Sequence, residues 1–103
     1  MGRKTPKGNG PKPFSGRPET MADEDLDLHG LAIDEAMVQA ELALARWRNR
    51  PGACIRIIHG KSSGIRDSIK GALRHNLETR WKNRIASFRQ EPANPGATLV
   101  FLP

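Results

Sequence analysis

The order in which the spacing of apolar residues changes along residues 26–102 constrains the fold most. Residues 26–30 alternate between apolar and polar side chains, which predicts a strand with Asp27 and His29 on the same face. The spacing then lengthens to three or four residues, which predicts an amphipathic helix that ends before the Pro-Gly pair at 51–52. Its predicted apolar face consists of Ile33, Met37, Ala40, Leu44 and Trp47.

A second strand and a second helix follow with the same change of period. Residues 53–58 are rich in β-branched side chains and lie between two glycines, which predicts a central strand. Apolar residues recur at helical spacing over residues 65–77, and we expect the side chain of Ser62 or Ser63 to cap this helix.

Two further strands are predicted at residues 85–90 and 97–102, joined by a proline-containing turn at residues 91–96. The element order β-α-β-α-β-β predicts an α/β fold, a two-layer α/β sandwich with a mixed four-stranded sheet. We expect the first three strands to pair in parallel and the last strand to be antiparallel to a neighbour. One face of the sheet is then partly open to a ligand.

Composition separates an N-terminal arm from one folded domain. Residues 1–20 hold four of the ten glycines, four of the eight prolines and five basic residues. Such a segment cannot bury enough apolar surface to offset its ordering entropy. We therefore predict a disordered basic arm at residues 1–22 and a single domain at residues 23–103. The arm is either a nucleic-acid contact or a solubilising tail without a specific role.

The charge distribution favours a polyanionic partner. The chain carries 17 Lys and Arg against 11 Asp and Glu, which gives a net charge of +6. Twelve of these cations and only two acids lie in residues 46–89, whereas residues 19–35 hold seven acids and no Lys or Arg. We expect a nucleic acid, RNA or DNA, as the partner. On the simpler alternative, about half of these cations only solvate an outer helix face.

Other sequence features bear on the location, the redox state and the assembly of the protein. No apolar run approaches the roughly 20 residues that span a bilayer, so we expect no membrane contact and a cytoplasmic location. The single cysteine, Cys54, excludes an internal disulfide and is expected in a buried strand. His75 is expected to be exposed and without a role. We expect a monomer that needs no cofactor.

Asp27 and His29 form the first candidate site. Because they lie two residues apart in a strand, the carboxylate can orient the imidazole, an arrangement that suits general-base catalysis. The same pair also fits a purely structural hydrogen bond.

His59, Gly60 and Lys61 form the second candidate site, after the second strand and before a helix. Anions bind at the carboxyl ends of parallel strands and at helix N-termini, so we expect the two histidines to converge on one phosphate. A nucleotide-binding P-loop is excluded, because it needs a glycine where the chain has Ile55. A divalent-metal site built from Asp27 and the two histidines is a poorer alternative, because too few ligands are present.

These residues resemble the Smr (small MutS-related) domain family. The family's Leu-Asp-x-His motif falls on residues 26–29, its His-Gly-x-Gly motif on residues 59–62, and a similar closing strand on residues 96–102. Ser62 departs from the second motif, since the family usually has glycine there. The resemblance covers the chain from about residue 25 to the C-terminus.

The resemblance implies a fold similar to the C-terminal domain of a bacterial translation initiation factor, together with endonuclease activity. Members of the family nick DNA or cleave RNA, including messenger RNA on stalled ribosomes, so the ribosome is a further candidate partner. Catalytic roles are implied for Asp27, His29 and His59. Phosphate binding is expected from Gly60, Lys61, Ser62, Ser63, Gly64 and Arg66.

Three mechanisms stay open. In the first, metal-independent cleavage of RNA, Asp27 orients His29 as the general base. His59 then protonates the leaving oxygen or binds the phosphate, while Lys61 and the loop amides stabilise the pentacoordinate charge. In the second, the chain is a non-catalytic nucleic-acid or ribosome binding module in which Ser62 marks a lapsed site. The third is metal-assisted nicking of DNA.

Overall fold

Strands and helices alternate along the chain, as the apolar spacing predicts. The computed structural model describes residues 21–61 and 68–103, so the predicted arm and most of the loop after Lys61 lie outside the described residues. The elements are β1 (Glu24–Asp27), α1 (Ile33–Trp47), β2 (Cys54–Ile58), α2 (Ile69–Glu78), the 3-10 helix η1 (Lys82–Arg84), β3 (Ser87–Glu91) and β4 (Asn94–Phe101).

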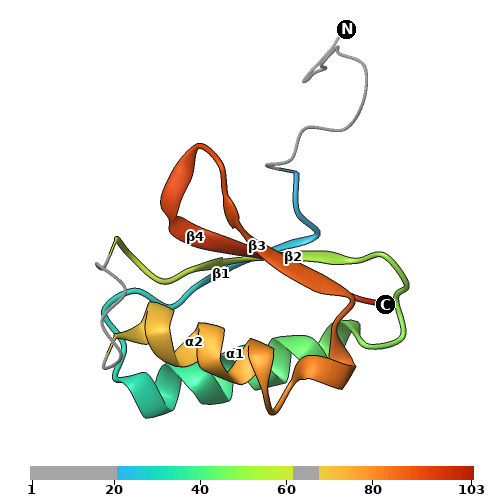
Figure 1. Cartoon of the computed structure of the whole chain (residues 1–103), viewed down its shortest axis with the longest axis horizontal. Coiled ribbons are helices and arrows are strands. Elements are labelled where there is room, and N and C mark those ends of the chain that lie inside the picture. Colours follow the sequence, from blue (N-terminus) through green and yellow to red (C-terminus); the bar gives the residue numbers. More distant parts are fainter. Residues whose placement is uncertain (1–20, 62–67) are drawn as a thin grey trace, which may run out of the picture.

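The two helices form one layer and the sheet forms the other. The strand order is β1-β2-β4-β3, with β1 and β2 parallel and β4 antiparallel to both of its neighbours. Both helices cover the same face of the sheet (Figure 1). The predicted two-layer α/β sandwich with a mixed four-stranded sheet and a central β2 is therefore confirmed.

The pairing of the third strand differs from the prediction. β3 runs in the same direction as β1 and β2 but pairs with β4, so only the first two strands form a parallel pair. β4 takes the inner position because residues 96–100 are all buried, which requires cover on both faces. β3 exposes three of its five side chains, as suits an edge strand.

The strand boundaries also shift from the predicted ones. β1 spans Glu24–Asp27 rather than residues 26–30, because the chain leaves the sheet before the turn at Gly30, which has a φ of 85°. The predicted turn at residues 91–96 shortens to two residues, and β4 already starts at Asn94. A register shift between Gln90 and Glu91 accommodates the added residues. No apolar spacing predicts η1.

Helix α1 packs on the sheet mainly through alanines. The predicted apolar face is only partly correct, since Ala40 and Leu44 are buried while Ile33, Met37 and Trp47 are half-buried. Small side chains let the helix lie close to the strands, so the larger ones flank the contact. The residues of α1 that are fully covered are Ala36, Ala40, Ala43 and Leu44.

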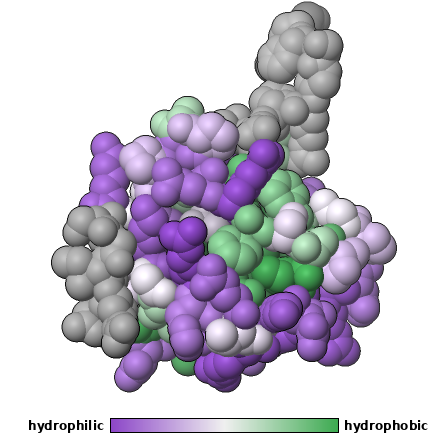
Figure 2. All heavy atoms as spheres, viewed as in Figure 1, coloured by the Kyte–Doolittle hydropathy of each residue, from purple (hydrophilic) through white to green (hydrophobic). Residues whose placement is uncertain are grey.

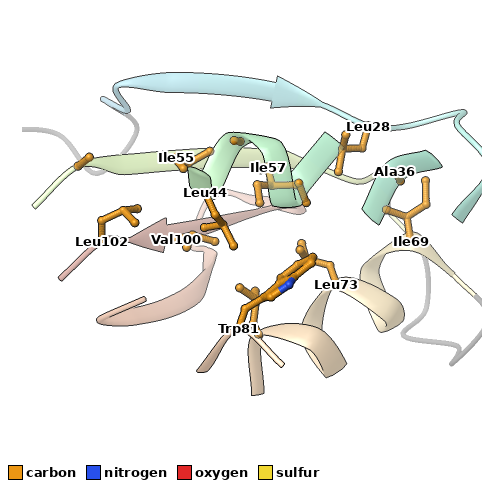
Figure 3. Close-up of a cluster of buried hydrophobic side chains, with 14 residues drawn as sticks. Leu28, Ala36, Leu44, Ile55, Ile57, Ile69, Leu73, Trp81, Val100 and Leu102 are labelled. Atoms are coloured by element: carbon orange, nitrogen blue, oxygen red, sulfur yellow. The ribbon is translucent and has the colours of Figure 1, made fainter. Parts of the chain in front are cut away.

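The core lies between the two layers. Figure 3 shows side chains from β2, α1, α2 and β4 meeting there around Trp81, which follows α2. Leu73 of α2 and Ile57 of β2 are each 1% exposed, so the second helix and the central strand share one apolar cluster. Cys54 is buried in β2 and His75 is exposed on α2, as predicted.

Ser68 caps the N-terminus of α2. Its Oγ accepts a hydrogen bond from the backbone N–H of Gly71 at 3.0 Å, and the helix begins at Ile69. The predicted cap at Ser62 or Ser63 is therefore wrong. Both of those serines, and the predicted helix start at residue 65, lie outside the described residues.

On the uncovered face of the sheet, Arg56 of β2 lies between two carboxylates. Its Nη1 donates to Oδ1 of Asp25 at 2.6 Å, and its Nε donates to Oε1 of Glu91 at 3.1 Å. Asp25 belongs to β1 and Glu91 to β3, so one guanidinium joins both edges of the sheet. Because two carboxylates surround this one guanidinium, the three groups carry a net charge of −1, and the middle of this face is a poor surface for a polyanion.

Removing the cap should destabilise the fold measurably. We expect Ser68→Ala to lower the free energy of unfolding by about 0.5–2 kcal/mol, because an N–H in the first turn of α2 loses its partner. Urea unfolding followed by circular dichroism measures this. Ser87→Ala, an exposed serine of β3, is the matched control and should change stability much less. Equal losses in both variants would contradict the cap assignment.

Candidate active site

The ends of β1 and β2 lie side by side. Asp27 pairs with Ile58, and the backbone N–H of Leu28 donates to the carbonyl of Ile58 at 2.7 Å. Because the pairing is parallel, the chain leaves both strands at the same edge of the sheet, with His29 after β1 and His59 after β2. Leu28, 1% exposed, anchors this end of β1 in the core.

Asp27 and His29 form a hydrogen-bonded, solvent-exposed pair. Oδ1 of Asp27 lies 2.5 Å from Nδ1 of His29 and also accepts the backbone N–H of His29 at 3.1 Å. The side chains are 54% and 66% exposed, respectively. The side-chain hydrogen bond from His29, followed by its backbone N–H, lowers the pKa of the Asp27 carboxyl below its ordinary value. The carboxylate therefore binds Nδ1–H, which leaves Nε2 as the ring nitrogen able to accept a proton.

Gly60 brings the second motif against the first. Its φ is 94°, a backbone conformation that residues other than glycine rarely adopt. A Cβ built at Gly60 would lie 3.8 Å from Cβ of His29. The carbonyl of Gly96 accepts the backbone N–H groups of His59 at 2.9 Å and Gly60 at 3.0 Å. The backbone of β4 thus holds the turn beside His29.

His59 is buried, unlike His29. Its ring is within hydrogen-bond distance of two oxygens, with Nδ1 2.8 Å from the carbonyl oxygen of Gly60 and Nε2 2.9 Å from Oγ1 of Thr98. Since a carbonyl only accepts, Nδ1 carries the proton, and in the neutral ring Nε2 accepts from the Thr98 hydroxyl. Burial lowers the pKa of the His59 imidazole, and Lys70 lowers it further, although the Gly60 carbonyl acts in the opposite direction.

The structure therefore brings some of the predicted site residues together and separates others. Asp27, His29 and Gly60 lie close to one another, and Lys61 follows with an exposed side chain. His59 lies beneath this surface, so its contact with a phosphate stays a prediction. The remaining predicted phosphate-binding residues lie outside the described residues: Ser62, Ser63, Gly64 and Arg66.

Two residues at this edge of the sheet are missing from the sequence-based site. Thr98 holds the buried ring of His59, and Gly96 accepts both N–H groups of the turn. The signal for Thr98 is a polar residue in the otherwise apolar run of residues 97–102. Its partner cannot be read from the sequence, because the two residues are 39 positions apart, with His59 after β2 and Thr98 within β4.

Two further findings concern the described part of the chain. Within residues 21–61 and 68–103, no three His, Cys, Asp or Glu side chains come together as a group that could hold a metal ion. In the same residues, no helix has the length and apolar character needed to cross a membrane.

Comparisons with known proteins identify the family and support the fold of this chain. The model of the Smr domain matches residues 26–103. Endonuclease MutS2 of Thermus thermophilus is 32% identical over 92 residues, which cover 88% of this chain but only 11% of that protein. The crystal structure of the Smr domain of that MutS2 has a TM-score of 0.64 and 31% identity, covering 78% of this chain and 98% of that domain. The human small-MutS related domain has a TM-score of 0.56 and 30% identity, covering 76% and 99%.

The Asp27–His29 hydrogen bond should be visible in a titration. We expect the pKa of the Asp27 carboxyl to lie below about 3.9, its ordinary value, and to rise towards it in His29→Ala. A lowered pKa stabilises the folded state above the ordinary value, and this contribution disappears as the pH falls through the lowered one. Carbon NMR of the aspartate carboxyls measures the shift. His75→Ala, which removes an exposed histidine of α2, should leave the Asp27 titration unchanged.

Burial of neutral His59 should make stability depend on pH. Because folding lowers its pKa, this group contributes fully above about 6.5, the ordinary value, and its contribution falls as the pH drops below it. We expect the free energy of unfolding to fall by up to about 1.4 kcal/mol per pH unit there.

Urea unfolding at a series of pH values tests this, with the ring titration of His59 by NMR as an independent measurement. His59→Gln should lose the pH dependence and His75→Ala should keep it. A His59 ring that titrates at or above its ordinary pKa would contradict the assignment.

Proposed function

Because the chain belongs to the Smr domain family, we propose that it is a nucleic-acid endonuclease that cleaves phosphodiester bonds, with RNA as its substrate. The observation that carries this proposal is the exposed Asp27–His29 pair beside the turn at Gly60. The name of the relative, Endonuclease MutS2, supports cleavage as the class of reaction.

His29 is the proposed general base. Asp27 holds its Nδ1–H, so Nε2 takes the proton from the 2′-hydroxyl of the substrate. The 2′-oxygen then forms a bond to phosphorus while the bond from phosphorus to the 5′-oxygen breaks. The protonated imidazole, paired with the Asp27 carboxylate, returns the proton to the leaving oxygen directly or through water. The products are a 2′,3′-cyclic phosphate and a 5′-hydroxyl.

Lys61 is the proposed contact for the phosphoryl oxygens among the described residues. Its side chain is exposed and follows Gly60, which lies against His29. The N–H of Gly60 already donates to the carbonyl of Gly96, so this amide does not serve the anion. A cation beside the reacting phosphate stabilises the charge that develops in the transition state. Ser62, Ser63, Gly64 and Arg66 remain predicted phosphate contacts.

We assign His59 a positioning role instead of the proton-donor role. A buried ring with a lowered pKa, whose two nitrogens both have hydrogen-bond partners, is poorly suited to protonate a leaving group. It fixes the carbonyl of Gly60 and ties the turn to Thr98. His29 therefore carries both proton transfers in this proposal.

The central test is cleavage of end-labelled single-stranded RNA in the presence of EDTA. We expect His29→Ala to lower the rate by about 10²–10⁴-fold while RNA affinity stays within a few-fold, because the base acts in the transition state. His75→Ala, purified identically, should cleave at the rate of the unmutated chain and excludes a contaminating ribonuclease. A 2′-deoxy substitution at the cut site should block the reaction.

Other outcomes separate the alternatives. Comparable loss of cleavage and affinity in His29→Ala would contradict the proposed role of His29. Binding that weakens with salt but yields no product would favour a non-catalytic binding module. Nicking of supercoiled plasmid that EDTA stops would favour metal-assisted cleavage of DNA.

A further inference from the structure

A hollow of about 360 Å³ lies between α2 and the edge strand β3. This volume falls within the roughly 300–1,000 Å³ of sites that hold small ligands. In Figure 2 hydrophobic residues gather where β3 runs above the helices in the same view of Figure 1, and hydrophilic residues border them. Among the side chains that line this hollow, the mechanism proposed above involves Thr98 alone, through its hydrogen bond to the buried ring of His59.

The lining of the hollow combines apolar and cationic groups. Phe88 of β3, which is half-buried, supplies apolar surface, and the buried side chain of Leu77 of α2 lies behind it. Lys70 and Arg74 lie one helical turn apart on α2, so both cations reach the same opening. Apolar surface beside paired cations is the combination that binds a base together with its neighbouring phosphates.

The existing partners of these cations leave room for a phosphate. Nζ of Lys70 donates to Oε1 of Gln90 at 3.1 Å, a contact with a neutral amide across the opening. Nε of Arg74 lies 3.7 Å from Oε2 of Glu78, and both side chains are more than half exposed. Exposed ion pairs of this kind are weak, so Glu78 competes little with a phosphate for a guanidinium that has five N–H donors.

Thr98 connects the hollow to the catalytic edge. This residue lines the hollow and its hydroxyl holds the ring of His59, which precedes Gly60, which in turn lies against His29. From β1 to β3 the sheet has three strand spacings, about 14 Å, which a few nucleotides of a single strand cover. One bound strand can therefore occupy both places.

The charge distribution favours an RNA strand that runs from the Asp27–His29 pair towards the hollow. The segment that leads into β1 and forms its first half carries three acids, Asp23, Glu24 and Asp25, and a polyanion is repelled there. Arg46 and Arg56 lie nearby but pair with Glu24 and Asp25. On the opposite side of the sheet, the opening between α2 and β3 presents Lys70 and Arg74.

We propose that the hollow between α2 and β3 is a nucleotide subsite for single-stranded RNA. One unpaired base packs against Phe88, and Lys70 and Arg74 bind the adjacent phosphates. The proposal rests on the function proposed above and adds the path of the substrate strand. It requires a single strand, because a base inside a duplex cannot reach an apolar surface between two elements.

The test measures binding apart from cleavage, in the His29→Ala background, by fluorescence anisotropy with a short fluorescein-labelled oligouridine. Lys70→Gln with Arg74→Gln should weaken binding about a hundredfold, since two charged contacts are lost and each is worth roughly tenfold. The slope of log affinity against log salt should fall by about 1.4, the value for two lost phosphate contacts on a single strand.

The matched control removes the same charge elsewhere. Arg48→Gln with Arg50→Gln alters two exposed arginines just after α1 and should change affinity and slope much less. Equal losses in the two double variants would mean general electrostatic attraction and overturn the proposal. No loss in the Lys70 and Arg74 variant would overturn it as well.

Crosslinking locates the base directly. RNA that contains 5-iodouridine should crosslink to the β3 segment that includes Phe88, and mass spectrometry identifies the peptide. Crosslinks confined to other segments would overturn the subsite. Affinity for duplex RNA should depend less on the Lys70 and Arg74 pair than affinity for the single strand does.

The failure of this inference and the failure of the proposed function are distinguishable. If the unmutated chain cleaves no RNA but the specific loss of binding and the Phe88 crosslink are observed, the subsite stands and the catalytic proposal fails. If the chain cleaves RNA while the Lys70 and Arg74 variant keeps its KM and affinity, the subsite alone fails.

Discussion

The parallel register of β1 and β2 is the constraint on which the candidate site depends. The hydrogen bond from Leu28 to Ile58 continues the pairing one residue past β1 and brings the two histidine-containing segments to one edge. A shift of one residue would exchange the faces of β1, so that Leu28 would leave the core and His29 would enter it. The same register that buries the leucine therefore exposes the Asp27–His29 pair.

The spacing of apolar and polar residues predicts those features that depend only on residues close together in the sequence. The alternation around Asp27 places its carboxylate and the imidazole of His29 on one side, and the helical repeat locates α1 from its first residue to its last. The position of β4 depends instead on which strand has apolar side chains on both faces, and chain order does not reveal that. The cap of α2 shows the same limit, because Ser62, Ser63 and Ser68 all precede the helix and only the backbone geometry selects Ser68.

The two histidines illustrate how little residue type says about chemistry. His29 lies two residues after β1 and His59 one residue after β2, and both fall within the residues that the Smr domain model matches. One ring is exposed and supported by a carboxylate, whereas the other is 5% exposed and bonded between a carbonyl and a hydroxyl. The hydroxyl comes from β4, a strand that is contiguous with neither motif. His59 continues the alternation that buries Ile55 and Ile57, and the pairing of β4 with β2 supplies the hydroxyl that its buried ring needs.

The edge position of β3 has a consequence for how the molecule behaves at high concentration. An edge strand presents backbone donors and acceptors along its outer side, and such a strand can template the addition of another chain. Here the strand is five residues long, exposes the charged side chain of Arg89 and ends in a register shift that bends the ladder. These three features oppose the addition of a second chain to β3, so an unpaired edge strand does not by itself lead to aggregation.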